Sequence, residues 1–429
     1  MLSTWLERVR ALGPGLLLAA AGIGAGDVVV ASVTGVKFGP TLLWAVVFTA
    51  ALKFVLTEAL ARWQLATGET VVRAWVTRLP RWVRVYFAAY LVLWTFLVGA
   101  SLSSACGLAG ASLFPGLSVP VWGALHAVAA ALLVALNRYA QFQKLMKALI
   151  GLMALCVLAC AVMTKPAVGP VLRGLVVPAL PANGGGAAVL ALLGGIGGSL
   201  TVICYGYWMR AAGWGGAEKL AAVRGDVRLA YVFTGLFGVA LVIIAAGVRA
   251  EATEGARIAL EVGERLAGVA GPVGRWVFLV GFWCTVFTAM LGVWQGVPQV
   301  YADLVNAWRG EAGKGAVRSD AVADAGEHVR GAAEQSEARN GVYFAALAYL
   351  AGPPLVLLWF KQPVAVVVMF SIAGAFFMPF LAATLLYLNN RRDWVGALAN
   401  QRRGNIALAV CLVVFGVVCA REIWTTLGK

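Results

Sequence analysis

Three charged side chains lie inside stretches that are otherwise almost wholly apolar. Asp27 follows the glycines of GIGAGD, and Lys53 and Glu58 fall within FTAALKFVLTEALARWQ. A charged group inside an apolar span is costly, usually faces a cavity or a partner, and indicates a functional site by default. The carboxylate of Asp27 could coordinate a cation, carry a proton or bind an amine. It could also simply cap a helix end, where the helix dipole favours an anion.

Lys53 and Glu58 have a structural and a functional interpretation. Lys53 is too deep to reach water easily and needs a partner, which Asp27 or Glu58 could provide; its ammonium could also replace a coupling cation. Glu58 lies one helical turn before Arg62, which favours a structural pair, although it could also take part in proton coupling. The sequence leaves open whether Asp27 and Lys53 are paired.

A second set of polar residues follows the glycine run GGIGG at 194–198. Hydroxyl groups, a thiol and free backbone carbonyls at this place could line a binding site. Tyr205 and Tyr207 could equally be packing residues, and Gln295 is one further polar candidate. The candidate substrate contacts are Gly24, Asp27, Ser199, Thr201, Cys204, Tyr205 and Ser371, and the candidate metal ligands among them are Asp27 and Cys204.

The sequence carries no enzyme signature. Its two histidines, His126 and His328, are far apart, and no HExxH, CxxC, GxSxG or P-loop lysine motif is present. His126 is expected to be satisfied locally within its span, and the seven cysteines are expected to pack as small apolar residues without disulfides. We therefore expect neither an enzyme nor a pump driven by its own ATP hydrolysis, and no cofactor.

The composition places these residues in a membrane. The chain has 429 residues, of which 61% are hydrophobic and only 12% are charged, whereas about 25% of the residues of soluble domains are charged. We predict one all-α integral membrane domain with about eleven spans of bilayer length. They cover 13–36, 40–61, 85–108, 118–137, 145–164, 187–210, 228–249, 274–298, 341–361, 364–388 and 405–424.

Glycines interrupt the first and the sixth of these spans at mid-depth. Because glycine weakens a helix, both spans are predicted to be broken. Two broken helices at matching positions indicate two halves of opposite orientation around a central site. We therefore predict a first five-helix repeat at 13–164, an inverted second repeat at 187–388, an additional helix at 405–424, and a flexible cytoplasmic loop at 309–340.

The loop charges predict an orientation. Most Lys and Arg residues fall on one side if the N-terminus is cytoplasmic, which places the C-terminus outside. The net charge of +15 is explained by these loops and does not require a nucleic acid partner. We expect an integral protein of a bacterial inner (plasma) membrane, with the bilayer and a small transported species as partners. The sequence does not predict the oligomeric state.

Several stretches resemble the Nramp family of proton-coupled divalent metal transporters. GPGLLLAAAGIGAGD is similar to that family's opening, in which GPG and an apolar run precede DPGN. LARWQLATGET resembles the end of its second helix, GGIGGSLTVICYGYW takes the place of its MPHN helix, and MPFLAATLLYLNNRRDWVG resembles its tenth-helix tract. The resemblance implies a LeuT-type inverted repeat, a central site between the first and sixth helices, and proton-coupled uptake.

The chain departs from the family pattern at the metal site. Gly24 stands in place of the family's Asp and Asp27 in place of its Asn. The MPHN methionine has no clear counterpart, Cys204 could supply sulfur near that position, and Ser371 falls near the family's tenth-helix glutamine. Lys53 adds a positive charge that a divalent-cation site would not favour.

Two functions remain open at this point. The first is alternating-access transport of a divalent metal cation, with a proton as a possible coupling ion. Its ligands would be Asp27, the carbonyls near Gly24 and Thr201, and Cys204. The second keeps the LeuT-like fold but moves a small organic or anionic solute, with Lys53 replacing a coupling cation. A membrane-embedded enzyme or a channel is the third and least supported class.

Overall fold

The computed structural model describes residues 13–136, 139–246, 256–310, 340–360 and 363–427. Every element in these ranges is a helix. The α-helices are α2 (Pro14–Gly22), α3 (Ala25–Phe38), α4 (Leu43–Thr67), α5 (Val71–Thr77), α6 (Arg81–Leu113), α7 (Val119–Leu136), α8 (Tyr139–Met163), α9 (Val168–Val176), α10 (Gly185–Gly195), α11 (Thr201–Ala211), α12 (Leu220–Ala245), α13 (Ala256–Trp308), α15 (Gly341–Ala351), α16 (Pro363–Leu388), α17 (Arg392–Val395) and α18 (Arg402–Leu427). Short 3-10 turns are η1 (Gly39–Leu42), η2 (Ala217–Lys219), η3 (Pro353–Phe360) and η4 (Gly396–Leu398).

The predicted all-helical membrane fold is confirmed. Within the described ranges, nine helical segments are long and apolar enough to cross a bilayer. This number treats α3 and α4 as one segment and omits the short helices α2, α10 and α11, so the count of eleven stays a prediction. The predicted loop at 309–340 falls almost wholly outside the described residues, as does His328.

Several helix ends differ from the predicted ones because polar residues continue a helix beyond its apolar core. The third span reaches from Arg81 to Leu113, and α12 already begins at Leu220. Helix α13 continues to Trp308, ten residues beyond the predicted end at 298. It also changes direction at Gly271, whose φ of 67° lies in the left-handed region and which precedes Pro272.

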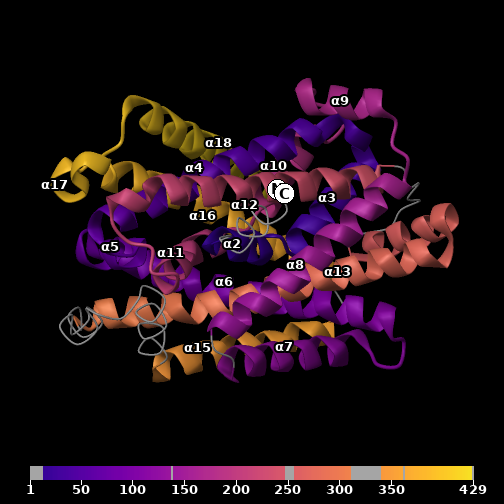
Figure 1. The fold of residues 1–429 in the computed structure, drawn as a ribbon, viewed down its shortest axis with the longest axis horizontal. Coiled ribbons are helices and arrows are strands. Elements are labelled where there is room, and N and C mark those ends of the chain that lie inside the picture. Colours follow the sequence, from indigo (N-terminus) through magenta and orange to yellow (C-terminus); the bar gives the residue numbers. More distant parts are fainter. Residues whose placement is uncertain (1–12, 137–138, 247–255, 311–339, 361–362, 428–429) are drawn as a thin grey trace, which may run out of the picture.

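The helices run side by side along the long axis of the molecule (Figure 1). Helices α2, α3 and α11 lie in the middle and contact α4, α12 and α13 around them, while α6 packs against both α13 and α16. Helices α7 and α15 lie at one edge, where each contacts α13. The broken helices therefore sit at the centre of the bundle.

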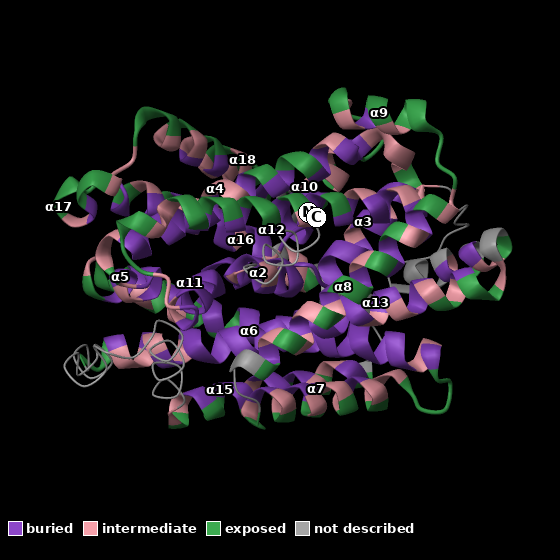
Figure 2. Ribbon diagram, viewed as in Figure 1, coloured by how far each residue is buried: buried purple, intermediate pink, exposed green. Residues whose placement is uncertain are grey.

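Burial follows the same arrangement. Side chains of the central helices are buried, whereas the outer faces of α7, α9 and α18 carry exposed residues (Figure 2). Many of the exposed side chains on these outer helices are apolar, among them Leu125, Leu132, Val413 and Val417. An apolar outer face on a bundle of apolar helices is what a lipid environment requires.

Candidate functional site

The first broken helix is interrupted by two extended residues. Helix α2 ends at Gly22, and Ile23 and Gly24 adopt extended backbone angles before α3 begins. Asp27 lies in the first turn of α3, and its Oδ2 accepts a hydrogen bond of 2.8 Å from the Gly24 N–H. The carboxylate thus caps a helix N-terminus, where the helix dipole favours negative charge.

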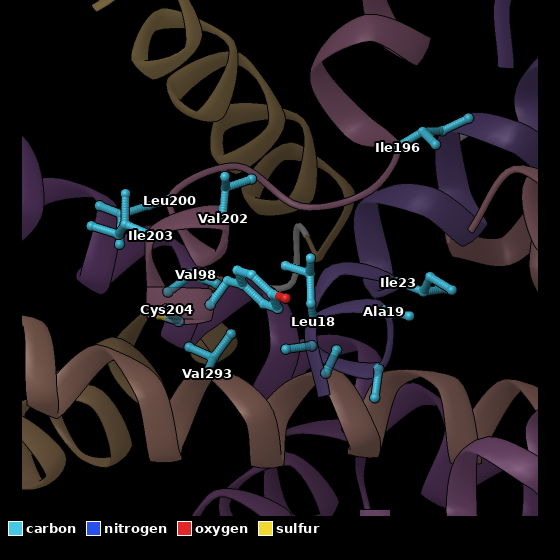
Figure 3. Close-up of a cluster of buried hydrophobic side chains, with 14 of the residues drawn as sticks. Leu18, Ala19, Ile23, Val98, Ile196, Leu200, Val202, Ile203, Cys204 and Val293 are labelled. Carbon is cyan, nitrogen blue, oxygen red and sulfur yellow. The ribbon is translucent and has the colours of Figure 1, made fainter. Parts of the chain in front are cut away.

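The second broken helix is interrupted by a longer segment, 196–200, which we call the strap. It joins α10 to α11 and is visible between Ile196 and Leu200 in Figure 3. Gly197 and Gly198 have φ values of 77° and 74°. Side chains other than glycine rarely tolerate these angles, which explains why a glycine pair occupies this place. The predicted break is therefore confirmed, and these two glycines determine its backbone conformation.

The two breaks are in direct backbone contact. A Cβ placed on Gly22 would lie 3.2 Å from the carbonyl group of Gly197, so no larger residue fits there without a shift. The Oδ1 atom of Asp27 accepts a hydrogen bond of 2.7 Å from the Gly197 N–H. Asp27 is 3% exposed. One buried carboxylate therefore joins the break of the first helix to the strap of the second.

Lys53 approaches the strap from the side of α4. Its side chain is fully buried, and its ammonium donates hydrogen bonds to the carbonyl oxygens of Ile196 and Gly198. Its partners are therefore backbone carbonyls, whereas the sequence suggested a carboxylate. Asp27 and Lys53, both within the described residues, make no ion pair within 4.0 Å.

The peptide unit between Ile196 and Gly197 connects the two charged groups. Its carbonyl oxygen accepts from Lys53, and its N–H donates to Asp27. A cation at the oxygen and an anion at the N–H both favour the orientation of this peptide dipole. The arrangement satisfies backbone groups that the break removes from helical pairing, as a membrane interior requires.

A small cavity lies between the two breaks and the neighbouring helices α6, α13 and α16. Its volume is about 20 Å³, enough for one water-sized particle. Five of the seven predicted substrate contacts line it, namely Gly24, Asp27, Ser199, Thr201 and Ser371. Among the described residues that line the cavity, Asp27 carries the only ionisable side chain.

The hydroxyl groups of the strap and of the first turn of α11 differ in their hydrogen bonds. Ser199 Oγ accepts a hydrogen bond of 2.9 Å from the Trp94 indole N–H of α6, which holds the strap on that side. The Oγ1 atom of Thr201 is buried and has no hydrogen-bond partner among the described residues. A buried hydroxyl without a partner is unfavourable unless a water, an ion or a ligand pairs with it.

Cys204 and Tyr205 do not line this cavity. The Cys204 sulfur faces α13, where a Cβ added to Gly296 would lie 2.7 Å from it. Tyr205 donates a hydrogen bond of 2.9 Å to Asp226 of α12. The sulfur that was a candidate metal ligand is therefore separate from the Asp27 carboxylate in this structure.

The other polar candidates make local contacts. Glu58 pairs with Arg62 at 3.3 Å and with Arg224 at 2.9 Å. Gln295 accepts a hydrogen bond from the Trp208 indole, and His126 bonds the Trp122 carbonyl oxygen and the Trp283 indole. None of these three residues lines the cavity.

Two kinds of residue at or near the site were not predicted from the sequence. Asp226 is a buried carboxylate whose Oδ2 accepts hydrogen bonds from the Gly15 N–H and from Tyr205, yet it precedes the predicted start of its span at residue 228. The apolar cavity wall comes from α6, α13 and α16, and includes Val98, Ala289, Val293 and Phe370. The apolar stretches of these helices show no amphipathic pattern, so the sequence does not distinguish their cavity side from the other side.

A larger cavity of about 270 Å³ lies elsewhere, next to Pro40, Lys165 and Ile243. It lies beside η1 and the end of α12, at the opposite end of α3 from the break, and none of the candidate residues lines it. The smaller cavity therefore remains the candidate site, because it combines a buried carboxylate, hydroxyl groups and two unwound segments.

The donor atoms at this cavity are oxygens. Carboxylate, hydroxyl and carbonyl oxygens suit hard cations such as Mg²⁺ and Mn²⁺, whereas thiol, thioether and imidazole groups suit softer ions. Within the described part of the chain, no cluster of three or more His, Cys, Asp and Glu side chains could hold a metal. A single cation at this place would depend on Asp27 together with hydroxyl and backbone oxygens.

Comparison with known proteins connects this architecture to one family. Residues 15–425 match the family described as natural resistance-associated macrophage protein-like (Nramp). The divalent metal cation transporter MntH of Klebsiella pneumoniae is 25% identical over 253 residues, which cover 56% of this chain and 58% of that transporter. The chain thus aligns with little more than half the length of this curated relative.

Solved structures support the fold. A mutant of the Eremococcus coleocola manganese transporter aligns with a TM-score of 0.73 and 15% identity, covering 98% of this chain and 87% of that one. The transporter Mhp1, of the nucleobase-cation-symport-1 family, aligns with a TM-score of 0.56 and 12% identity, covering 97% of this chain and 93% of that one. The LeuT-like fold with two broken helices is thereby confirmed, whereas the division into repeats at 13–164 and 187–388 stays a prediction.

Proposed function

This chain belongs to the Nramp family, and we propose from that premise that it is a secondary transporter that moves a divalent metal cation by alternating access. The observation that carries the proposal is the Asp27 carboxylate, which lines a cavity between two broken helices. In transporters with inverted repeats, unwound segments at the membrane midplane form the site for the transported species.

The proposed ligands of the cation are oxygen atoms. A carboxylate offers about four lone-pair positions, and two of those on Asp27 accept backbone N–H groups. The remaining positions, the unpartnered Thr201 hydroxyl and the Ser199 hydroxyl could complete a small oxygen site. We leave Cys204 out of this ligand set because its sulfur faces Gly296. A hard divalent cation is therefore the favoured cargo.

We propose a proton as the coupling ion, exchanged at Asp27. Asp27 is the ionisable group at the cavity, whereas Glu58 is held between Arg62 and Arg224. Competition between a proton and a cation for one carboxylate couples their movements without any further residue. In this proposal the protein changes no covalent bond and needs no cofactor.

The proposed location is the plasma membrane of a bacterium, with the N-terminus in the cytoplasm and the C-terminus outside. The distribution of Lys and Arg residues among the loops supports this orientation. The apolar outer face of the bundle supports the bilayer as its environment.

A second candidate function is transport of a small organic or anionic solute. The buried ammonium of Lys53 favours it, because a fixed positive charge beside the site disfavours a divalent cation. Lys53 donates to strap carbonyls and is not among the cavity-lining residues, so it would act as a replacement for a coupling cation rather than as a direct ligand of an anion.

Isothermal titration calorimetry of the purified protein tests the proposal. Mn²⁺, Mg²⁺, Ca²⁺ and Fe²⁺ are titrated into the wild type, into Asp27→Asn and into Asp393→Asn, which changes an exposed carboxylate. Saturable heat with one ion that Asp27→Asn loses and Asp393→Asn keeps supports the metal function. No heat with any ion in folded wild-type protein refutes it and favours the organic or anionic solute.

Transport itself is measured with proteoliposomes that contain a metal-sensitive dye. Uptake of the bound ion should be saturable and should fail in Asp27→Asn. It should also raise the pH of the lumen, because a proton that competes with the metal for one carboxylate leaves as the metal enters. Uptake without any change of pH would retain the metal function but contradict coupling to a proton.

A further inference from the structure

Two carbonyl oxygens of the strap lack their usual helical partners. In a continuous helix the Gly198 oxygen would accept from the Val202 N–H, but that N–H bonds the Ser199 oxygen at 3.1 Å. The Ile196 and Gly198 oxygens instead accept from the Lys53 ammonium. Unwound carbonyls at such a break are the groups that coordinate monovalent cations in related architectures.

The geometry around the ammonium is that of a cation site with a covalently attached occupant. Lys53 is 0% exposed, and its aliphatic stem packs against the strap, where a Cβ on Gly197 would lie 3.4 Å from Lys53 Cδ. Its charge faces carbonyl oxygens, and no carboxylate among the described residues pairs with it within 4.0 Å. A carbonyl oxygen accepts a stronger hydrogen bond from a charged donor, such as an ammonium, than from a neutral donor.

We propose that the Lys53 ammonium is the tethered occupant of a monovalent cation site formed by the strap carbonyls of Ile196 and Gly198. It holds the break between α10 and α11 in place without a free cation from solution. Through the Ile196–Gly197 peptide it also orients the N–H that bonds Asp27. Lys53 is thus a positioning residue for the candidate site.

The inference predicts that removing the side chain creates an empty site that a free cation can fill. Lys53→Ala leaves space and two unpaired carbonyls, whereas Lys53→Met fills the space with an uncharged chain of similar length. Thermal unfolding of each purified variant is measured in choline chloride and in NaCl, KCl or methylammonium chloride at equal ionic strength. Lys37→Ala, which removes an exposed lysine of α3, is the matched control.

The wild type and Lys37→Ala should unfold at the same temperature in all four salts. Lys53→Ala should unfold several degrees lower in choline and recover in at least one small cation. Lys53→Met should be destabilised in every salt, because the methionine leaves no room for an ion. Wild-type stability of Lys53→Ala in choline, or a loss that no cation relieves, overturns the proposal.

If Lys53→Ala yields no folded protein in any of these salts, Lys53→Ser is measured in its place. Its short side chain carries no charge and leaves room for a small cation beside the two carbonyl oxygens. Wild-type stability of Lys53→Ser in choline, or a loss that Na⁺, K⁺ and methylammonium all fail to relieve, overturns the proposal; a loss that one of them relieves supports it. The inference deepens the proposed transport function, but these measurements contain no divalent metal, so its failure is distinguishable from a failure of metal binding at Asp27.

Discussion

The unpartnered Thr201 hydroxyl gives a direct test at the level of single residues. Thr201→Val removes the hydroxyl and keeps the shape of the side chain. Because Thr201 Oγ1 has no hydrogen-bond partner among the described residues, this change should leave the stability of the ligand-free protein unchanged or slightly higher. If the hydroxyl binds the cation, affinity should fall roughly five- to tenfold.

Calorimetry for affinity and thermal unfolding for stability separate these two effects. Thr67→Val is a useful comparison, since the Thr67 hydroxyl bonds the Trp63 carbonyl oxygen at the far end of α4 and should not alter metal affinity. An unchanged affinity in Thr201→Val would remove Thr201 from the proposed ligand set.

The oxygen donors also predict which metals bind. Cys204, the nearest candidate sulfur in sequence, faces α13, so the cavity offers no soft ligand among its described lining residues. We therefore expect Mn²⁺ or Mg²⁺ to bind more tightly than Cd²⁺. Cys204→Ser should leave this order and the affinities unchanged. Tightest binding of Cd²⁺, lost in Cys204→Ser, would show that the thiol reaches the cation in another conformation.

At the level of elements, the strap depends on glycine at two positions. Gly197→Ala places a side chain at a φ of 77° and within 3.3 Å of the Thr234 methyl group. The left-handed conformation alone should lower the free energy of unfolding by about 1–2 kcal/mol. The Gly197 N–H would also shift away from Asp27, which should weaken cation binding.

Gly416→Ala is the matched control for this change. Gly416 lies within α18, and nothing in the structure would contact an added Cβ. Alanine should stabilise that helix by roughly 0.5–1 kcal/mol. Equal unfolding temperatures of Gly197→Ala and the wild type in a thermal shift assay would mean that the strap can relax at little cost.

The sequence predicts the positions of these breaks because their signal is local. Glycine runs weaken a helix wherever they occur, so GIGAG and GGIGG are sufficient to locate both interruptions. Asp27 is also predictable, since a carboxylate between apolar stretches is too costly to bury without a partner or a ligand. These features do not depend on which helices lie next to one another.

The contacts of Lys53 and Cys204 could not be predicted in the same way. Whether Lys53 contacts a carboxylate or a carbonyl depends on how α4 is rotated about its axis relative to the strap. A helix without a clear amphipathic pattern does not reveal this rotation in its sequence. The same limit applies to Cys204, which could face the cavity or α13. Asp226 was missed because a charged residue near the end of a span is normally interfacial.

At the scale of the whole molecule, Asp226 joins three elements on the side of the α2 N-terminus. Its Oδ2 accepts a hydrogen bond of 2.6 Å from the Gly15 N–H of α2 and one of 2.9 Å from Tyr205 of α11, while Asp226 itself belongs to α12. Alternating access requires such half-helices to separate from their neighbours during part of the cycle. This carboxylate therefore stabilises the packing of α2 against α11 and α12.

Asp226→Ala should loosen α2 without altering the cavity. The N-terminal N–H groups of α2 lose a charged acceptor, and each hydrogen bond to a charged group contributes about 1.5–3 kcal/mol. Amide hydrogen exchange across 14–22 should therefore become faster, while exchange in α7 stays the same. Tyr205→Phe removes one of the two bonds to Asp226 and should give a smaller increase, and Asp393→Ala should give none. Unchanged exchange of α2 in Asp226→Ala would mean that packing against α11, α12 and α13 holds this half-helix without the carboxylate.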